Sequence, residues 1–176
     1  MALFPDDLTA LAEQVVRENR AAGRLVALAE SCTGGLVSGI LTEIPGSSHM
    51  LGRGFVTYSN AAKQELLGVH SDVIDTFGAV SVATAWAMAR GTLDHSHADV
   101  AVAITGVAGP GGGSPQKPVG TVVFARAIKG GDPDDVVADT KRFPDEGRTA
   151  IRLQAVRCAL ELLLPGGAAS AGDGAP

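Results

Sequence analysis

Two short apolar segments place the strongest limits on how this 176-residue chain can fold. The segments "RLVALA" (24–29) and "DVAVAIT" (99–105) are almost continuously apolar and lack the alternation of a half-exposed strand. Runs of this kind are typical of strands that are covered on both faces. A sheet built from such strands needs a layer of helices on each side.

Segments with helical spacing of apolar residues separate the predicted strands. Residues 6–23 have this spacing, with Asp6 or Asp7 as the expected cap and Gly23 as the stop. Further helices are predicted over 34–44, 61–68 (Asn60 as cap), 81–97 (Ser81 as cap) and 145–164 (starting near Asp145 or Glu146), and further strands over 52–59, 121–128 and 135–143. The segment "GGDPD" (130–134) would join the last two strands as a hairpin. We therefore expect an α/β fold, a three-layer α/β/α sandwich with a mixed, mostly parallel sheet.

Size, charge and cysteine content narrow the possible functions. One domain is expected over 1–164, followed by a disordered tail over 165–176. The formal net charge of −5 argues against a nucleic-acid partner, because backbone binding needs clustered Lys and Arg. The two cysteines make no disulfide framework and no CxxC metal pattern, so both are expected to be free thiols. The sequence shows no basic leader and no run of roughly 18 apolar residues, which predicts a cytoplasmic protein with no membrane partner.

The segment "AESCTGGLVSG" lies where the first buried strand gives way to a helix. Ser31, Cys32 and Thr33 would lie at a helix N-terminus, where unpaired N–H groups and the helix dipole favour a phosphate or an oxyanion. Gly34 and Gly35 would let a ligand approach the backbone closely. The alternative is a plain strand–turn–helix junction capped by Ser or Thr. The segment matches neither a Walker loop nor GxGxxG.

A long loop rich in glycine and proline, residues 106–120, follows the second buried strand. Loops of this length are uncommon in compact domains and are usually functional or disordered. Pro110, Pro115 and Pro118 would stiffen it, which fits the wall of a pocket better than a linker. The alternative is a mobile surface loop.

A hydroxyl nucleophile needs a base, and the sequence offers few. His70 follows a helix stop, and His95 and His97 lie in a polar helix end, whereas His49 lies in a loop and stays possible. Lys63 comes shortly after a core strand, and a lysine can act as a base where burial or a positive neighbour lowers its pKa. From these residues alone, an exposed helical lysine without a catalytic role is the simpler interpretation.

Seven motifs together resemble the C-terminal domain of the CinA (competence/damage-inducible) proteins, a family that includes stand-alone nicotinamide-nucleotide amidases. They are "AESCTGGLVSG", "PGSS", "GFVTYSNAAKQELLGV", "GAVS", "AVAITGVAGPGGG", "KPVGTV" and "GRTAIR", and the resemblance runs from about residue 7 to residue 164. It implies a three-layer α/β/α fold and hydrolysis of the carboxamide of nicotinamide mononucleotide (NMN) to nicotinate mononucleotide and ammonia. It also implies no metal or organic cofactor, and a homo-oligomer.

Carried over position by position, the resemblance makes Ser31 the nucleophile and Lys63 its base. The tetrahedral oxyanion would lie against N–H groups at the start of the following helix. The residues expected to bind substrate are Thr33, Gly34, Gly35, Ser48, Tyr58, Thr105, Gly106 and Arg148.

Arg148 would supply the cation for the phosphate of NMN. This chain has "EGR" (146–148) where relatives often have "GDR", which leaves the placement of that arginine open. It also has Gln116 where relatives often have Gly before "KPVG".

Three alternatives remain open at this stage. Cys32 is the rival nucleophile, because a thiolate at a helix N-terminus is well activated, unless it is only a small packing residue. The domain would otherwise be a pyridine-nucleotide sensor that binds without hydrolysis, or an amidase for another small amide. A pure sensor would not require a serine–lysine pair.

Overall fold

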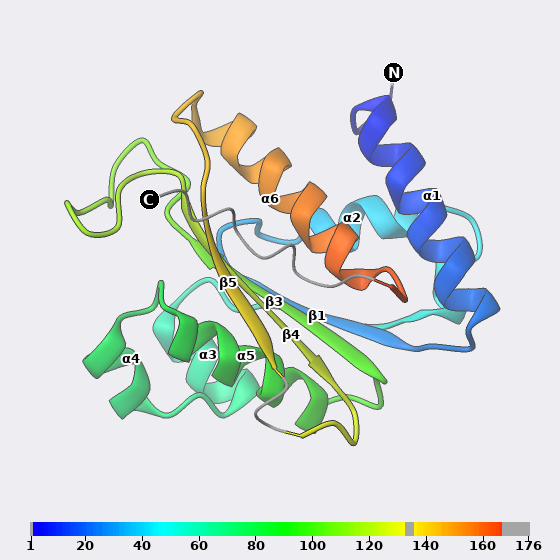
Figure 1. Ribbon diagram of the computed structural model, residues 1–176, viewed down its shortest axis with the longest axis horizontal. Helices are drawn as coiled ribbons and strands as arrows, with labels where there is room; N and C mark the ends of the chain where they lie inside the picture. The colour runs from blue at the N-terminus through cyan, green and yellow to red at the C-terminus, as the bar shows by residue number, and fades with distance from the viewer. Residues whose placement is uncertain (1, 133–135, 167–176) are drawn as a thin grey trace.

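A computed structural model describes residues 2–132 and 136–166 and shows one five-stranded sheet in the order β2-β1-β3-β4-β5 (Figure 1). The strands are β1 (Val26–Glu30), β2 (Leu51–Val56), β3 (Val100–Gly106), β4 (Thr121–Ile128) and β5 (Val137–Arg142). β1 pairs in parallel with β2 and β3, whereas β4 is antiparallel to both β3 and β5. Four strands therefore run in one direction and β4 runs against them, which confirms the predicted mixed, mostly parallel sheet.

Helices cover both faces of the sheet, which confirms the predicted three-layer sandwich. Figure 1 shows α1, α2 and α6 on one face and α3, α4 and α5 on the other. The helices are α1 (Asp6–Ala21), α2 (Leu36–Glu43), α3 (Asn60–Leu67), α4 (Ser71–Phe77), α5 (Val82–Asp94) and α6 (Arg148–Leu163), with a short 3₁₀ helix, η1 (Ser47–His49), before β2.

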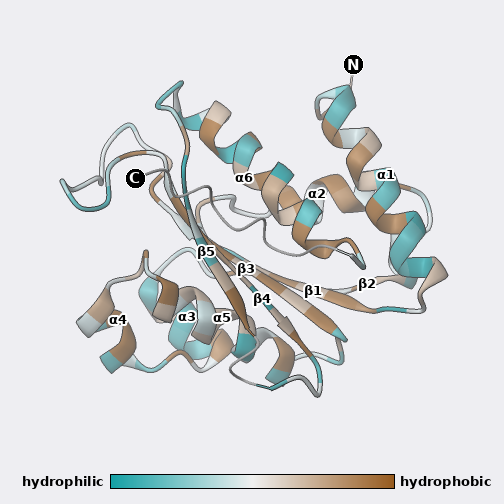
Figure 2. Cartoon of the chain, in the orientation of Figure 1, coloured by the Kyte–Doolittle hydropathy of each residue, from teal (hydrophilic) through white to brown (hydrophobic). Residues whose placement is uncertain are grey.

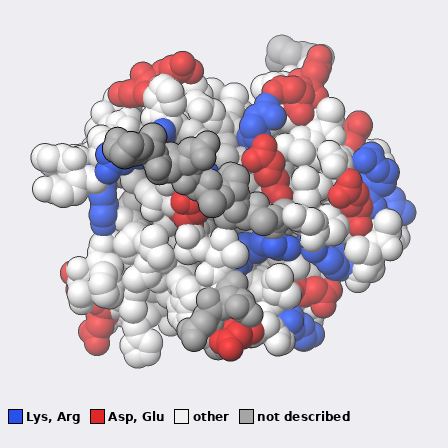
Figure 3. All heavy atoms as spheres, viewed as in Figure 1, with Lys and Arg blue, Asp and Glu red and all other residues white. Residues whose placement is uncertain are grey.

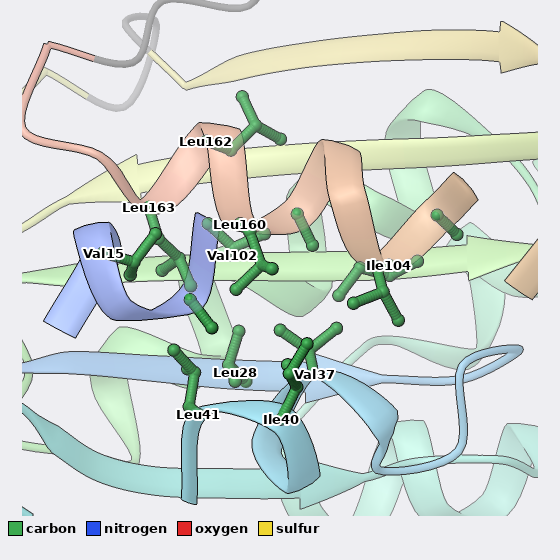
Figure 4. Packing of buried hydrophobic residues seen from close by; sticks show 14 of the residues in the cluster. Val15, Leu28, Val37, Ile40, Leu41, Val102, Ile104, Leu160, Leu162 and Leu163 are labelled. Carbon is green, nitrogen blue, oxygen red and sulfur yellow. The ribbon is translucent and has the colours of Figure 1, made fainter. Parts of the chain in front are cut away.

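The apolar runs of the sequence form the centre of the sheet, where successive side chains point into opposite cores. Leu28, Val102 and Ile104 pack against α1, α2 and α6, where Figure 4 shows them meeting Val37 and Leu160. The other core, beneath α3 to α5, receives Ala29, Ala103 and further small strand residues. Figure 2 shows the apolar residues gathered along the central strands. Burial on both faces explains why β1 and β3 lack polar alternation.

Several local expectations need correction. Ser59, not Asn60, caps α3, because its Oγ accepts from the Ala62 N–H. Pro5 occupies the N-cap of α1, so Asp6 and Asp7 lie in its first turn. α6 begins at Arg148 rather than near Asp145, and the sequence analysis did not predict α4 or η1.

Two other expectations are confirmed where the structure describes them. Ser81 caps α5 by accepting from the Thr84 N–H at 3.1 Å. β4 and β5 pair as a hairpin. Residues 133–134 of the predicted turn, residue 135 of the predicted strand and residues 167–176 of the predicted tail lie outside the described residues.

The topology brings two loops to one edge of the sheet. β1 and β3 are adjacent and parallel, so Ser31 and the end of β3 meet where both strands finish, and the Ser31 N–H donates to Ile104 O at 2.9 Å. This is the edge at which open α/β sheets bind ligands.

On the face seen in Figure 3, basic side chains lie in separate groups among acidic ones. No helix in the described ranges is long and apolar enough to cross a bilayer.

Candidate active site

A tight turn joins β1 to α2 and carries the candidate nucleophile. β1 ends at Glu30, and α2 begins only at Leu36. The Gly34 N–H donates to Ser31 O at 3.1 Å, and Gly34 and Gly35 have φ values of +61° and +97°. This left-handed backbone favours glycine, so the two glycines are required by the turn itself.

Lys63 reaches Ser31 from the neighbouring helix. Its Nζ lies 3.0 Å from Ser31 Oγ and donates to Thr57 O at 2.9 Å. The side chain is 1% exposed, because α3 starts directly after the β2 end and turns this residue toward the sheet. The structure therefore joins the two predicted catalytic residues in one buried hydrogen bond.

The surroundings of Lys63 favour the neutral amine. Burial lowers the pKa of Lys63 from its ordinary 10.5, and the nearby Cys32 thiol opposes this shift. Within the described part of the chain no carboxylate forms an ion pair with Lys63. A neutral amine has a lone pair that accepts the Ser31 hydroxyl proton, which is the first requirement for a general base.

A cavity of about 180 Å³ opens beside this pair and collects six of the ten predicted site residues. It is lined by Ser31, Cys32, Tyr58, Asn60, Lys63, Ala79, Val80, Thr105, Gly106, Ala108 and Arg148. No histidine lines it in the described structure, and His49 lies on η1, away from this edge of the sheet. Of the candidate bases, only Lys63 is in place.

Arg148 and Tyr58 lie together at the exposed side of the cavity. The Arg148 guanidinium donates to Tyr58 Oη at 3.0 Å and to Gly109 O at 2.8 Å, so it joins the β2–α3 connection to the long loop. Tyr58 is 61% exposed. Both partners of Arg148 are neutral, so its charge is available to an anion.

Thr105 is buried behind the cavity. Its Oγ1 donates to Ala79 O at 2.8 Å, which holds the turn before α5 against the end of β3. This contact positions Ala79 and Val80 as part of the cavity wall.

The structure does not bring the other four predicted binding residues into the cavity. Thr33 is fully buried, Gly34 is exposed, and neither they nor Gly35 line the cavity. Ser48 is exposed on η1, before β2, and because β2 runs parallel to β1 this is the opposite end of the sheet from Ser31. Their binding roles stay predictions.

Comparisons with known proteins agree with this fold. The family model described as the CinA C-terminal domain matches residues 8–165. The chain belongs to the CinA C-terminal domain family.

Relatives in this family fall into two lengths. The chain spans only about a third of longer relatives, such as a putative competence-damage inducible protein of Symbiobacterium thermophilum (52% identity, 73% of this chain and 30% of the relative). It spans most of two shorter ones that are named nicotinamide-nucleotide amidohydrolase PncC. These are from Enterobacter agglomerans (50% identity, 82% and 86% covered) and Escherichia coli K12 (47% identity, 89% and 93% covered).

Solved CinA structures have the same architecture. The competence/damage inducible protein CihA of Agrobacterium tumefaciens matches with a TM-score of 0.88 and 52% identity, over 93% of this chain and 97% of that one. A CinA superfamily protein from Escherichia coli matches with a TM-score of 0.83 and 33% identity, over 93% of each chain.

Glu30, in the family motif "AESCTGG", has a role that the sequence did not reveal. Its buried carboxylate accepts from the N–H groups of Gly35, Val37 and Ser38 at 2.9–3.1 Å, and from Ser38 Oγ at 2.8 Å. We expected the amides at the start of α2 to face a ligand, and Glu30 occupies them instead. The sequence shows an acidic residue at the end of an apolar strand, which could have indicated a structural role for Glu30. Its burial depends on the fold and could not be predicted from this pattern.

Two further residues were missed. Asn60 lines the cavity, although the sequence pattern indicated only a helix cap. Arg152 contacts the nucleophile turn from α6, more than a hundred residues later in the chain. Among the described residues, no group of three or more His, Cys, Asp or Glu side chains is arranged to hold a metal ion.

The environment of Cys32 argues against a thiolate nucleophile. Cys32 is 5% exposed and packs in the core beneath α2. Burial raises the pKa of its thiol to about 11, although its own backbone N–H and the charge of Arg152 oppose the shift. Ser31 is therefore the better placed of the two candidates, because it alone contacts Lys63 through a hydrogen bond.

We expect iodoacetamide at pH 7.5 to leave Cys32 unmodified in the folded protein. With a pKa of about 11, roughly one thiol in 3,000 is ionised at that pH, and the side chain is also shielded. Peptide mass spectrometry after timed alkylation checks this, with the urea-unfolded chain as the control in which Cys32 reacts. Rapid alkylation of native Cys32 would show a thiolate and restore it as the rival nucleophile.

Proposed function

We propose that this CinA-family domain hydrolyses the carboxamide of NMN to nicotinate mononucleotide and ammonia, with Ser31 as nucleophile and Lys63 as base. The observation that carries the proposal is the buried 3.0 Å contact between Lys63 Nζ and Ser31 Oγ in the cavity wall. The names of the two short relatives support the reaction and the substrate. The proposed reaction uses no metal or organic cofactor.

The first half of the reaction forms an acyl-enzyme. Ser31 Oγ attacks the amide carbon while neutral Lys63 takes the hydroxyl proton, and the carbonyl electron pair moves onto oxygen. When the tetrahedral intermediate collapses, the carbonyl re-forms and the C–N bond breaks. The Lys63 ammonium returns its proton to the leaving nitrogen, which departs as ammonia and leaves Lys63 neutral.

The second half repeats the proton transfers with water. A water molecule attacks the acyl carbon and gives its proton to Lys63, and collapse of the second intermediate breaks the bond to Ser31 Oγ. Lys63 then returns the proton to Ser31. The same lysine serves as base and acid in both halves, which requires a pKa closer to neutral than that of an exposed lysine.

The size of the cavity limits how NMN would bind. About 180 Å³ is less than the roughly 300–1,000 Å³ of typical ligand pockets, so the cavity fits the pyridine ring and its carboxamide but not the whole nucleotide. The ribose and phosphate would extend past Tyr58 toward Arg148. There the guanidinium lies at the first residue of α6, and no side chain caps this helix start, so its amides add to the attraction for an anion.

We expect wild-type protein to release ammonia from NMN and Ser31→Ala to lose at least about 10³-fold in kcat, as nucleophile removal does in other serine hydrolases. Lys63→Met should lose a comparable factor, whereas Cys32→Ala should keep most of the activity. An ammonia assay on purified variants, each checked for native melting, measures this.

Three other results would contradict the assignment in different ways. An inactive Cys32→Ala beside an active Ser31→Ala would transfer the chemistry to the thiol. Wild-type protein that is stabilised by NMN but releases no ammonia would be a sensor. Turnover of another small amide in preference to NMN would make it a different amidase.

We expect Arg148→Gln to raise KM for NMN about 10-fold or more and to leave KM for nicotinamide riboside nearly unchanged. A charge-assisted contact to phosphate contributes about 1.5–3 kcal/mol to binding. Nicotinamide riboside has no phosphate, so it does not make this contact and the substitution removes nothing from its binding. Steady-state kinetics with both substrates separate these effects. The matched control is Arg142→Gln, because Arg142 ends β5 and donates to Gln116 O of the long loop. An equal rise in KM for both substrates would rule out Arg148 as the phosphate contact.

A further inference from the structure

Arg152 on α6 holds two carbonyls of the turn that carries Ser31. Its Nε donates to Cys32 O at 3.1 Å and its Nη2 donates to Thr33 O at 2.9 Å. The side chain is half-buried, and no carboxylate in the described ranges forms an ion pair with it. The guanidinium lies against Gly34, where a β-carbon would be 3.4 Å from Nη2.

The N–H groups of this turn and of the start of α2 are almost all engaged. Ser31 N–H donates to Ile104 O, Gly34 N–H to Ser31 O, and Leu36 N–H to Thr33 O. The N–H groups of Gly35, Val37 and Ser38 donate to the Glu30 carboxylate. Within the part of the chain that is described, the N–H groups of Cys32 and Thr33 donate to no oxygen, and the Cys32 N–H contacts only its own thiol.

The contacts of Arg152 determine the direction of these two N–H groups. In a trans peptide the carbonyl of one residue points opposite to the N–H of the next. With Cys32 O held by Arg152, the Thr33 N–H must point away from the guanidinium. With Thr33 O held as well, the Gly34 N–H points toward Ser31 O, and that bond in turn orients the Cys32 N–H.

The N–H groups of Cys32 and Thr33 point toward the start of the turn, where Ser31 lies, and of these two residues only Cys32 lines the cavity. The Gly34-to-Ser31 bond winds residues 31–34 as a helical turn does, and N–H groups in such a turn face its first residue. An oxyanion formed on a carbon bonded to Ser31 Oγ would lie next to the Cys32 N–H.

We propose that Arg152 is a positioning residue for the reaction at Ser31, which holds the turn so that the Cys32 N–H is the oxyanion donor. The identity of the substrate in this inference rests on the proposed function, whereas the contacts of Arg152 with the turn do not depend on it. It also changes which amides stabilise the intermediate, because those at the start of α2 belong to Glu30.

The test uses Arg152→Gln and Arg152→Lys, with Arg157→Gln as the matched control. Arg157 is on the same helix and pairs with Asp7 of α1 on the surface. The first readout is the rate at which a small fluorophosphonate labels Ser31, followed by mass spectrometry. In that reaction Ser31 Oγ bonds to phosphorus, fluoride leaves, Lys63 takes the proton, and negative charge grows on the phosphoryl oxygen. The second readout is ammonia release from NMN across pH.

We expect Arg152→Gln to slow both labelling and kcat by about 10²-fold, the usual effect of losing an oxyanion donor, with KM changed less than about threefold. Arg152→Lys can reach only one of the two carbonyls, so its labelling rate and kcat should lie between those of wild type and Arg152→Gln. If the Gln variant does not fold, the Lys variant provides the test. The acidic limb of the kcat–pH profile should stay in place, because Arg152 does not act through Lys63.

Other outcomes overturn the inference. Labelling and kcat equal to those of Arg157→Gln would make Arg152 a structural residue, and a shifted acidic limb would mean that the variants disturb Lys63. If wild-type protein is labelled at Ser31 but releases no ammonia from NMN, the proposed function fails while the labelling rates still test Arg152. If wild-type Ser31 is not labelled and no ammonia is released from NMN, both fail.

Discussion

The burial of the Lys63 amine beside Ser31 is the constraint on which the rest of the site depends. A buried lysine is costly as an ammonium ion, so the site favours the neutral form, and the two acceptors at 2.9–3.0 Å satisfy the amine in place of water. The fold meets this requirement with three short elements: β1 delivers Ser31, β2 leads to Thr57, and the Ser59 cap starts α3 so that Lys63 points inward. In the proposed reaction, that neutral amine is what activates a hydroxyl at physiological pH.

Two charged residues outside the cavity shape the turn that carries the nucleophile. Glu30 holds the turn from the α2 side through three backbone N–H groups, and Arg152 holds it from α6 through two carbonyls. The carboxylate accepts and the guanidinium donates, so the two together leave few conformations open to residues 31–35. The left-handed backbone of this turn requires the glycines at 34 and 35, and neither of them lines the cavity.

The sequence was sufficient for what depends on local pattern. The apolar runs, the Ser81 cap and the hairpin after the long loop all follow from periodicity and turn residues, and the family motifs brought together Ser31, Lys63, Tyr58, Thr105 and Arg148. It was insufficient where the outcome depends on distant contacts. Nothing local shows that Glu30 is buried or that Arg152 reaches back to the turn, and nothing places Ser48 at the opposite end of the sheet. The predicted cytoplasmic location, homo-oligomeric state and lack of a nucleic-acid partner stay predictions.

The most direct test of Lys63 as the base for Ser31 is the titration of the Lys63 amine itself. The chain has four lysines, so ¹³Cε-labelled lysine gives a simple NMR spectrum, and Lys63→Arg identifies the signal. Because burial disfavours the charged form, we predict that Lys63 titrates below 10.5, whereas the partly exposed Lys141, which donates to Asp139, titrates above it. A Lys63 signal that titrates at or above 10.5 would mean a charged amine at neutral pH and would contradict its role as the base for Ser31.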